Sequence, residues 1–146
     1  MTLKEIKKAV NSALKKRYPE YKIYGADTIE GYTRPSFFVY ITQTFLETTK
    51  NARHKNVEVE IYYIQKVANE ADGTDFFTTM EEAFGQKLTV GSRSLNTSDM
   101  ELTFQGENTN IPACRFDVEF WDRIPKKEKE NCKIMKELRF AQEVKD

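Results

Sequence analysis

The opening residues of the chain follow a helical pattern of apolar and charged positions. Apolar residues recur every three or four positions from Leu3 to Leu14, and lysines occupy the opposite face. Thr2 and Glu5 have the spacing of a capping box, in which a hydroxyl and a carboxylate satisfy each other's backbone amides. Because the ring of Pro19 cannot continue a helix, the pattern predicts a helix that ends just before it.

Alternation with a period of two dominates the middle and the end of the chain. From Val57 to Tyr63 and from Cys114 to Trp121, apolar and polar residues alternate, which is typical of strands with one buried face. Other segments are rich in aromatic and β-branched residues, which favour strands. The predicted strands cover residues 21–24, 36–48, 57–63, 88–95, 100–105 and 114–121.

Polar and glycine-containing segments predict the connections. Residues 49–56 form a polar connection, which we expect to be the tip of a long β-hairpin carrying an exposed His54. Residues 69–74, with Asp72 and a following glycine, predict a turn. A second helix is expected after this turn, with Thr78 and Glu81 as its capping box and Gly85 as its stop. A charged C-terminal helix is expected from Pro125.

The predicted order of elements is α-β-β-β-α-β-β-β-α. Hairpin-length links between the strands favour an α+β fold, with a mostly antiparallel sheet flanked by N-terminal, central and C-terminal helices. No linker or repeat divides residues 1–146, so we expect a single domain.

Composition excludes several classes of protein. The 23 basic and 23 acidic residues balance, so no net charge draws the chain to nucleic acid, and no specific nucleic-acid partner is expected. The longest apolar runs are too short to span a bilayer, and the N-terminus lacks the apolar region of a secretory peptide. We therefore expect a cytoplasmic chain whose two cysteines, Cys114 and Cys132, are free thiols.

Residues that carry chemistry are sparse. One histidine and two distant cysteines do not form a metal-binding signature, and no glycine-rich phosphate loop is present. We predict no catalytic residues, no cofactor and no metal. Two alternatives stay open: a small metal-dependent enzyme that uses same-face acids such as Glu58 and Glu60, and a nucleic-acid-binding module built on the basic hairpin tip.

Three short strings resemble the tail terminator proteins of long-tailed bacteriophages and prophages. The first helix ends in Tyr18-Pro19 and leads into Tyr21-Lys22-Ile23-Tyr24. The loop and strand entry at residues 31–39 read Gly-Tyr-Thr-Arg-Pro-Ser-Phe-Phe-Val. A strand over residues 53–63 is followed by a helix and by a late strand at residues 116–120.

The resemblance implies a structural protein of the virion tail, assembled in the cytoplasm of the bacterial host. Such proteins form a ring, typically a hexamer, on the end of the tail tube, stop its polymerisation and present a surface to the head-completion proteins. The implied partners are copies of the chain itself, the tail tube protein and a head-completion or connector protein. A head–tail connector or neck protein is the neighbouring alternative.

The resemblance carries no catalytic residues, so the candidate site is a set of contact residues. Loops on a rigid sheet often carry function, and exposed aromatics beside charges are enriched at protein interfaces. The candidate interface residues are Lys50, Arg53, His54, Lys55, Tyr62, Asp72 and Trp121.

Overall fold

The computed structural model describes residues 1–28 and 30–124 and confirms the predicted order of elements within them. The elements are α1 (Leu3–Arg17), β1 (Lys22–Tyr24), β2 (Ser36–Thr48), β3 (Ala52–Ile64), α2 (Glu70–Phe84), β4 (Lys87–Val90), β5 (Arg93–Gln105) and β6 (Ile111–Arg123). The expected C-terminal helix from Pro125, together with Cys132, lies outside the described residues.

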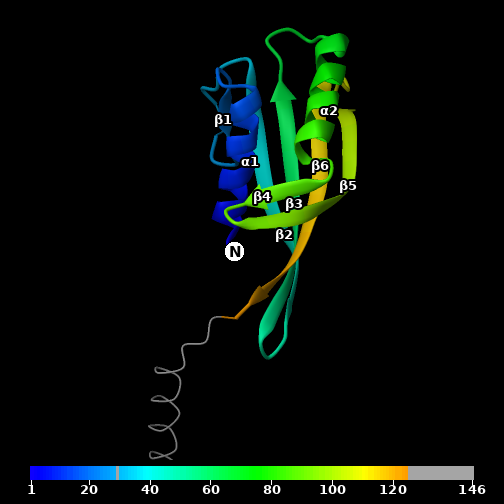
Figure 1. Cartoon of the computed structure of the whole chain (residues 1–146). Coiled ribbons are helices and arrows are strands. Elements are labelled where there is room, and N and C mark those ends of the chain that lie inside the picture. Colours follow the sequence, from blue (N-terminus) through cyan, green and yellow to red (C-terminus); the bar gives the residue numbers. More distant parts are fainter. Residues whose placement is uncertain (29, 125–146) are drawn as a thin grey trace, which may run out of the picture.

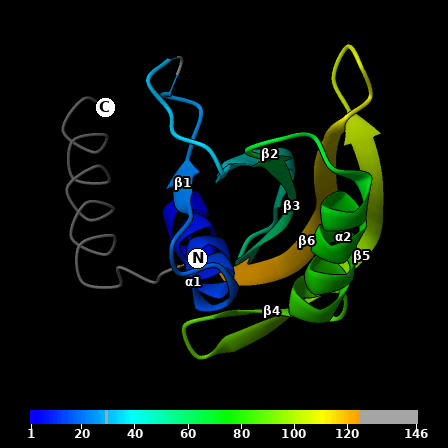
Figure 2. The ribbon, with the colours of Figure 1, turned by 90° about the horizontal axis from the view of Figure 1, so that it is seen from above.

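The strands form one curled sheet in the order β1-β2-β3-β6-β5-β4 (Figures 1 and 2). The chain is therefore α+β, and four of the five strand pairs are antiparallel. The pair β1–β2 differs because it is parallel. The loop between these two strands carries the chain back along the sheet, so that β2 runs in the same direction as β1.

One face of the sheet, here called the inner face, carries the core. Both helices pack on it, α1 against β2 and β4, and α2 against β6 and β4. Burying each large apolar side chain contributes roughly 1.5–3 kcal/mol, so this layer supplies most of the stabilisation. Its fully buried members include Ile6, Val10, Leu14, Phe37, Val57, Val59, Ile61, Phe76, Met80, Phe84, Phe116 and Val118.

Helix α1 begins and ends as its sequence predicts. The Thr2 hydroxyl accepts a hydrogen bond of 3.2 Å from the backbone amide of Glu5. At the other end, the amide of Tyr18 donates to the carbonyl of Leu14, and Pro19 follows. The capping residue and the proline therefore set both boundaries.

Helix α2 begins earlier than predicted. Asn69 caps it by accepting a hydrogen bond of 3.3 Å from the amide of Asp72, so residues 70–74 are helical rather than a turn. The predicted capping pair Thr78 and Glu81 lies inside the helix. Gly85 is the C-cap, as predicted.

The hairpin of β2 and β3 has a shorter loop than predicted. Strand β3 already begins at Ala52, and Thr48 pairs with Arg53 across the ladder. Only residues 49–51 form the loop, which the Thr49 amide and hydroxyl close through hydrogen bonds with Ala52. Residues 52–56 are polar on both faces and so resemble a loop in sequence, but their backbone pairs with β2 and β6.

The strand predicted at residues 88–95 is instead a tight hairpin. Gly91, with a φ of 60°, turns the chain between β4 and β5, and Val90 pairs with Arg93. Strand β5 then continues into the strand predicted at residues 100–105, with an irregularity in its pairing near Asp99, whose φ is 55°. Strand β6 has the predicted alternation, with Phe116 and Val118 buried and Trp121 exposed.

Candidate interaction surfaces

The ends of β2, β3 and β6 project beyond the two helices as an arm (Figure 1). Loop residues 49–51 form its tip, and Lys50 and Arg53 are exposed there. Three of its large apolar side chains are about half exposed: Phe45 (47%), Leu46 (50%) and Trp121 (52%). The arm therefore combines two free cations with apolar surface.

His54 lies between two aromatic rings on the outer side of the arm. Its ring stacks on Trp121 at a centroid distance of 4.5 Å and an interplanar angle of 9°, and it meets Phe45 edge-on at 5.4 Å. Its Nε2 contacts Glu119, and its Nδ1 lies 3.9 Å from Glu47. The expectation of an exposed loop histidine is therefore wrong, because the side chain is only 16% exposed and belongs to a strand.

Lys55 is occupied on the other side of the arm. Its ammonium donates to the carbonyl of Met1 at 3.3 Å and lies 3.8 Å from Asp122. The N-terminal ammonium contacts the same Asp122 carboxylate at 2.7 Å, and Arg93 also binds it. Lys55 therefore helps to fasten the arm to the body, whereas Lys50 and Arg53 near the tip are exposed and take part in no ion pair of the described residues.

The environment of Asp122 shifts its acidity. Burial raises the pKa of this carboxyl, but hydrogen bonds from the N-terminal ammonium and from Arg93 outweigh burial, so its pKa lies below the usual value. The carboxylate is charged near neutral pH and joins the N-terminus, β3, β5 and β6.

Asp72 is not part of an exposed turn. Its carboxylate accepts hydrogen bonds from the Tyr63 hydroxyl at 2.6 Å and from the Gln65 amide at 3.1 Å. Burial, followed by the bond to Asp72, raises the pKa of Tyr63. The structure therefore gives Asp72 an internal role, holding the start of α2 against β3.

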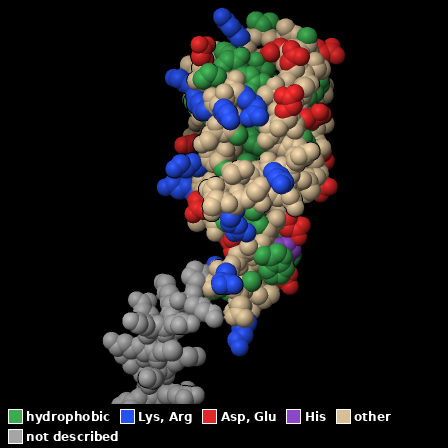
Figure 3. All heavy atoms as spheres, in the orientation of Figure 1, with side chains coloured by type: hydrophobic (Ala, Val, Ile, Leu, Met, Phe, Trp, Pro, Cys, Tyr) green, Lys and Arg blue, Asp and Glu red, His purple; other side chains and the backbone are tan. Residues whose placement is uncertain are grey.

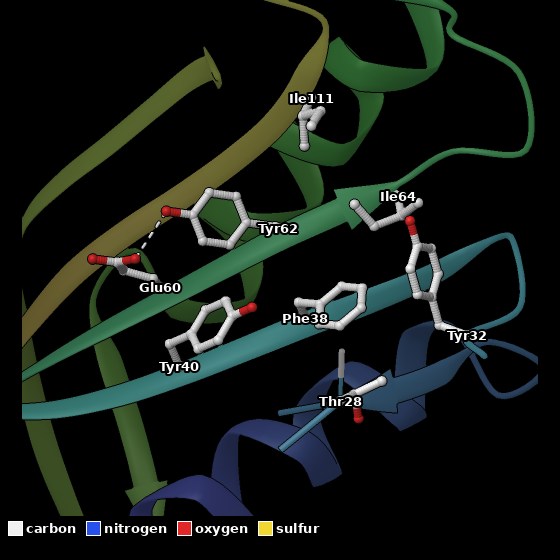
Figure 4. A pocket seen from close by; sticks show the side chains of 8 residues that line it. All are labelled: Thr28, Tyr32, Phe38, Tyr40, Glu60, Tyr62, Ile64 and Ile111. Carbon is white, nitrogen blue, oxygen red and sulfur yellow. Dashed lines mark hydrogen bonds between the residues drawn. The ribbon is translucent and has the colours of Figure 1, made fainter. Parts of the chain in front are cut away.

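Tyr62 lies on the outer face of the sheet, in a shallow hollow of about 560 Å³ (Figure 4). Its hydroxyl donates to Glu60 at 2.9 Å, and burial, followed by this bond, raises its pKa to about 12. The rings of Tyr32, Phe38 and Tyr40 stand beside it. Together with Thr28, Ile64 and Ile111, these residues form an aromatic recess with a single carboxylate.

The same-face acids are arranged around a cation. Arg115 contacts Glu58 at 3.2 Å and Glu101 at 3.7 Å, in the middle of the outer face. A hydrogen bond with Glu60, followed by burial, raises the pKa of Glu58. Within residues 1–28 and 30–124, no group of three or more His, Cys, Asp or Glu side chains is placed to hold a metal ion.

Two further findings concern the Cys114 thiol and membrane-spanning helices. The Cys114 thiol is buried, and burial raises its pKa to about 12, so it is not a ready nucleophile. No helix in the described part of the chain is long and apolar enough to cross a membrane.

The structure brings together some of the predicted contact residues and separates others. His54 and Trp121 form one cluster with Lys50 and Arg53 nearby, whereas Tyr62 belongs to the recess farther along the outer face. Sequence reasoning missed Phe45, Glu47 and Glu119, which complete the cluster around His54. Alternation alone places Glu119 on the outer side of β6. Phe45 and Glu47 reach the outer side only because the pairing of β2 with β3 shifts between Gln43 and Phe45, which the sequence does not reveal.

The family model of the phage tail terminator protein matches residues 5–130 of this chain. This chain belongs to the phage tail terminator family. The match confirms the resemblance seen in the sequence and supports a structural role in the phage tail. No curated protein matches the chain.

Two solved structures are similar to this chain. One, named only by a sequence identifier, has a TM-score of 0.50 and 10% sequence identity, and the match covers 86% of this chain and 97% of that one. At this identity the likeness shows the fold alone. A chain from the virion of a native gene transfer agent particle matches with a TM-score of 0.42 and 13% identity, covering 81% of this chain and 90% of its own.

Proposed function

We propose that copies of this chain close into a ring, a hexamer by family resemblance, on the end of a phage tail tube. The ring stops tube polymerisation and presents the surface to which a head-completion or connector protein binds. Assembly takes place in the cytoplasm of the bacterial host, and the ring stays in the virion tail. The family match over residues 5–130 is the observation that carries this proposal.

The proposed mechanism is geometric. A head-to-tail contact between identical subunits closes into a ring when its rotation divides the circle, and otherwise continues as a filament. A ring has two different faces. When one face fits the last ring of the tube and the other does not, no further tube subunit can add. No bond-breaking chemistry is needed.

The arm supports a contact with a neighbouring tail component. It projects from the body and carries two free cations and exposed aromatic surface, a combination enriched at interfaces. We assign the contact to Lys50, Arg53, His54 and Trp121. The ion pairs of Lys55 and Asp122 hold the arm in place. Tyr62 belongs to the separate outer-face recess and is a second candidate contact.

Removing the gene tests the proposal. A phage or prophage that lacks this chain should make tubes without a fixed length and no joined heads, as measured by electron microscopy of induced lysates. Expression of the wild-type chain in trans should restore uniform length. Tubes of normal length that fail to join heads would contradict tail termination and indicate a neck protein instead.

The arm is tested in the same complementation assay. The variant Lys50→Glu/Arg53→Glu should fail to restore uniform tails, because it reverses both free charges of the tip. The matched control Lys50→Arg/Arg53→Lys keeps those charges and should restore them. Full complementation by the reversed variant would remove the tip from the mechanism.

A further inference from the structure

The two helices carry opposite charges, although the whole chain is neutral. Helix α1 holds six basic residues and one acidic residue, a net charge of +5. Helix α2 holds five acidic residues and no basic one, a net charge of −5. The charged side chains take no part in the core, because the buried positions of both helices are apolar or glycine.

The charged helices lie over different strands of the inner face. Helix α1 packs against β2 and β4, and α2 packs against β6 and β4. Seen from above, α1 and α2 occupy separate places beside the curled sheet (Figure 2). On the surface shown in Figure 3, Lys and Arg side chains gather mainly over α1, and Asp and Glu side chains mainly over α2.

Each helix has exposed charges that are available to a partner. None of the ion pairs within residues 1–28 and 30–124 includes a residue of either helix. Lys4, Lys8 and Lys16 on α1 are exposed. The same holds for Asp75, Glu81 and Glu82 on α2.

The basic side also offers a recess. A groove of about 650 Å³ runs between α1, β4 and the end of α2, where Ala83 and Phe84 line it. Lys8, Lys16, Arg17 and Lys87 line it beside the apolar side chains of Ala9, Ala13 and Leu88. Such a groove fits an acidic helix, which can place its carboxylates on the rim and its small side chains inside.

We propose that the acidic α2 side of one copy docks on the basic α1 side of the next. Contacts of α1 with α1, or of α2 with α2, would bring like charges together, which costs several kcal/mol. Only the unlike pairing is attractive, and it leaves one basic and one acidic side free on the growing assembly. This is the head-to-tail contact that a ring requires. The inference rests on the proposed ring function and names its subunit contact.

Charge reversal on one side tests the contact. Lys4→Glu/Lys8→Glu/Lys16→Glu makes both helices acidic, and Asp75→Lys/Glu81→Lys/Glu82→Lys makes both basic. Each variant should weaken self-association of the purified chain by about 100-fold, measured by sedimentation velocity at low salt. Thermal unfolding of each variant shows that it remains folded.

The decisive variant combines all six substitutions in one chain. It reverses the sign of the net charge on each helix, from +5 to −1 on α1 and from −5 to +1 on α2, so unlike sides face each other again and association should be stronger than in either one-sided variant. The control Lys22→Glu/Lys66→Glu/Asn108→Asp/Asn110→Asp has the same net charge as the α1 variant but changes exposed residues outside both helices and the arm, and it should associate normally. Raising the salt to 1 M shortens the screening length to about 3 Å and should dissociate the wild-type assembly.

Three results would overturn the inference. The one-sided variants could associate as strongly as wild type, or the variant with all six substitutions could associate no better than they do. The wild-type chain could also be monomeric at low salt and high concentration. A closed dimer in place of larger species would overturn the head-to-tail geometry. None of these results bears on tail length in the gene deletion, so the failure of this contact and the failure of tail termination are distinguishable.

Discussion

Asp122 shows how single residues hold the arm on the body. It lies on β6 and is contacted by the N-terminal ammonium, by Arg93 of β5 and by Lys55 of β3. Its side chain is 11% exposed, so these contacts are shielded from water. Because its pKa in the folded chain is lowered from 3.8, it contributes stability above that pH, and the contribution is lost as the pH falls through the lowered value.

We expect Asp122→Asn to lower the free energy of unfolding by about 2–3 kcal/mol at neutral pH. The substitution leaves the ammonium of Met1 and the guanidinium of Arg93 without the counter-charge that they share, at a position where the Asp122 side chain is only 11% exposed. Chemical denaturation measures the loss, and the exposed Glu107→Gln is the control. The loss should shrink as the pH is lowered below 3.8, because the carboxyl then takes up a proton in the unfolded wild-type chain, and it should vanish below the lowered pKa of the folded chain. If the free energies of unfolding of wild type and Asp122→Asn differ by a constant amount across this pH range, the ion-pair explanation is wrong.

Residue roles were predictable where they depend on local pattern. The inward set of β6, including the buried Cys114, follows from alternation alone. The roles of Lys55 and Asp72 were not predictable, because their partners are set by the fold. Lys55 meets Met1, 54 positions away, and Asp72 meets Tyr63 on another element. The sequence alone does not show whether a polar side chain faces water or a charged group from a distant part of the chain.

At the scale of elements, Gly73 explains how α2 approaches the sheet. A Cβ atom at this position would lie 2.8 Å from the Phe104 ring and 3.0 Å from Pro112. Glycine lowers helix propensity by up to about 1 kcal/mol relative to alanine, so its place inside a helix indicates a packing requirement. In sequence, the same glycine after Asp72 predicted a turn.

We expect Gly73→Ala to destabilise the chain by about 1–3 kcal/mol, because the overpacking exceeds the gain in helix propensity. Thermal unfolding is the measurement. The exposed position Thr78 in the same helix provides the control, where Thr78→Ala should be neutral or slightly stabilising. A stabilising Gly73→Ala would show that α2 and β5 can separate without cost.

Element order was predictable and element ends were less so. Amphipathic periods identified both helices and the long strands, because those segments bury one face. The start of β3 was missed, since residues 52–56 lack an apolar face and are held by backbone pairing with β2 and β6. The β4–β5 hairpin was missed because its turn depends on the single glycine, Gly91.

At the scale of the whole molecule, the strand order and the curvature of the sheet could not be predicted from the sequence. The parallel pairing of β1 and the place of β6 beside β3 arise from long-range packing rather than local pattern. The charges of the helices could be counted in the sequence. Their meaning depends on the fold, which packs α1 against β2 and α2 against β6 on the inner face of one sheet. The outer-face recess around Tyr62 likewise combines β2, β3 and the loops beside them.

The position of the chain on the tail tests the account most directly. Purified tails and virions can be labelled with gold-conjugated antibodies against this chain and viewed by electron microscopy. We expect label at one end of each tail, the end that meets the head, and at no other place along the tube. Label distributed along the tube, or absent from complete tails, would contradict the claim that this chain closes the tube.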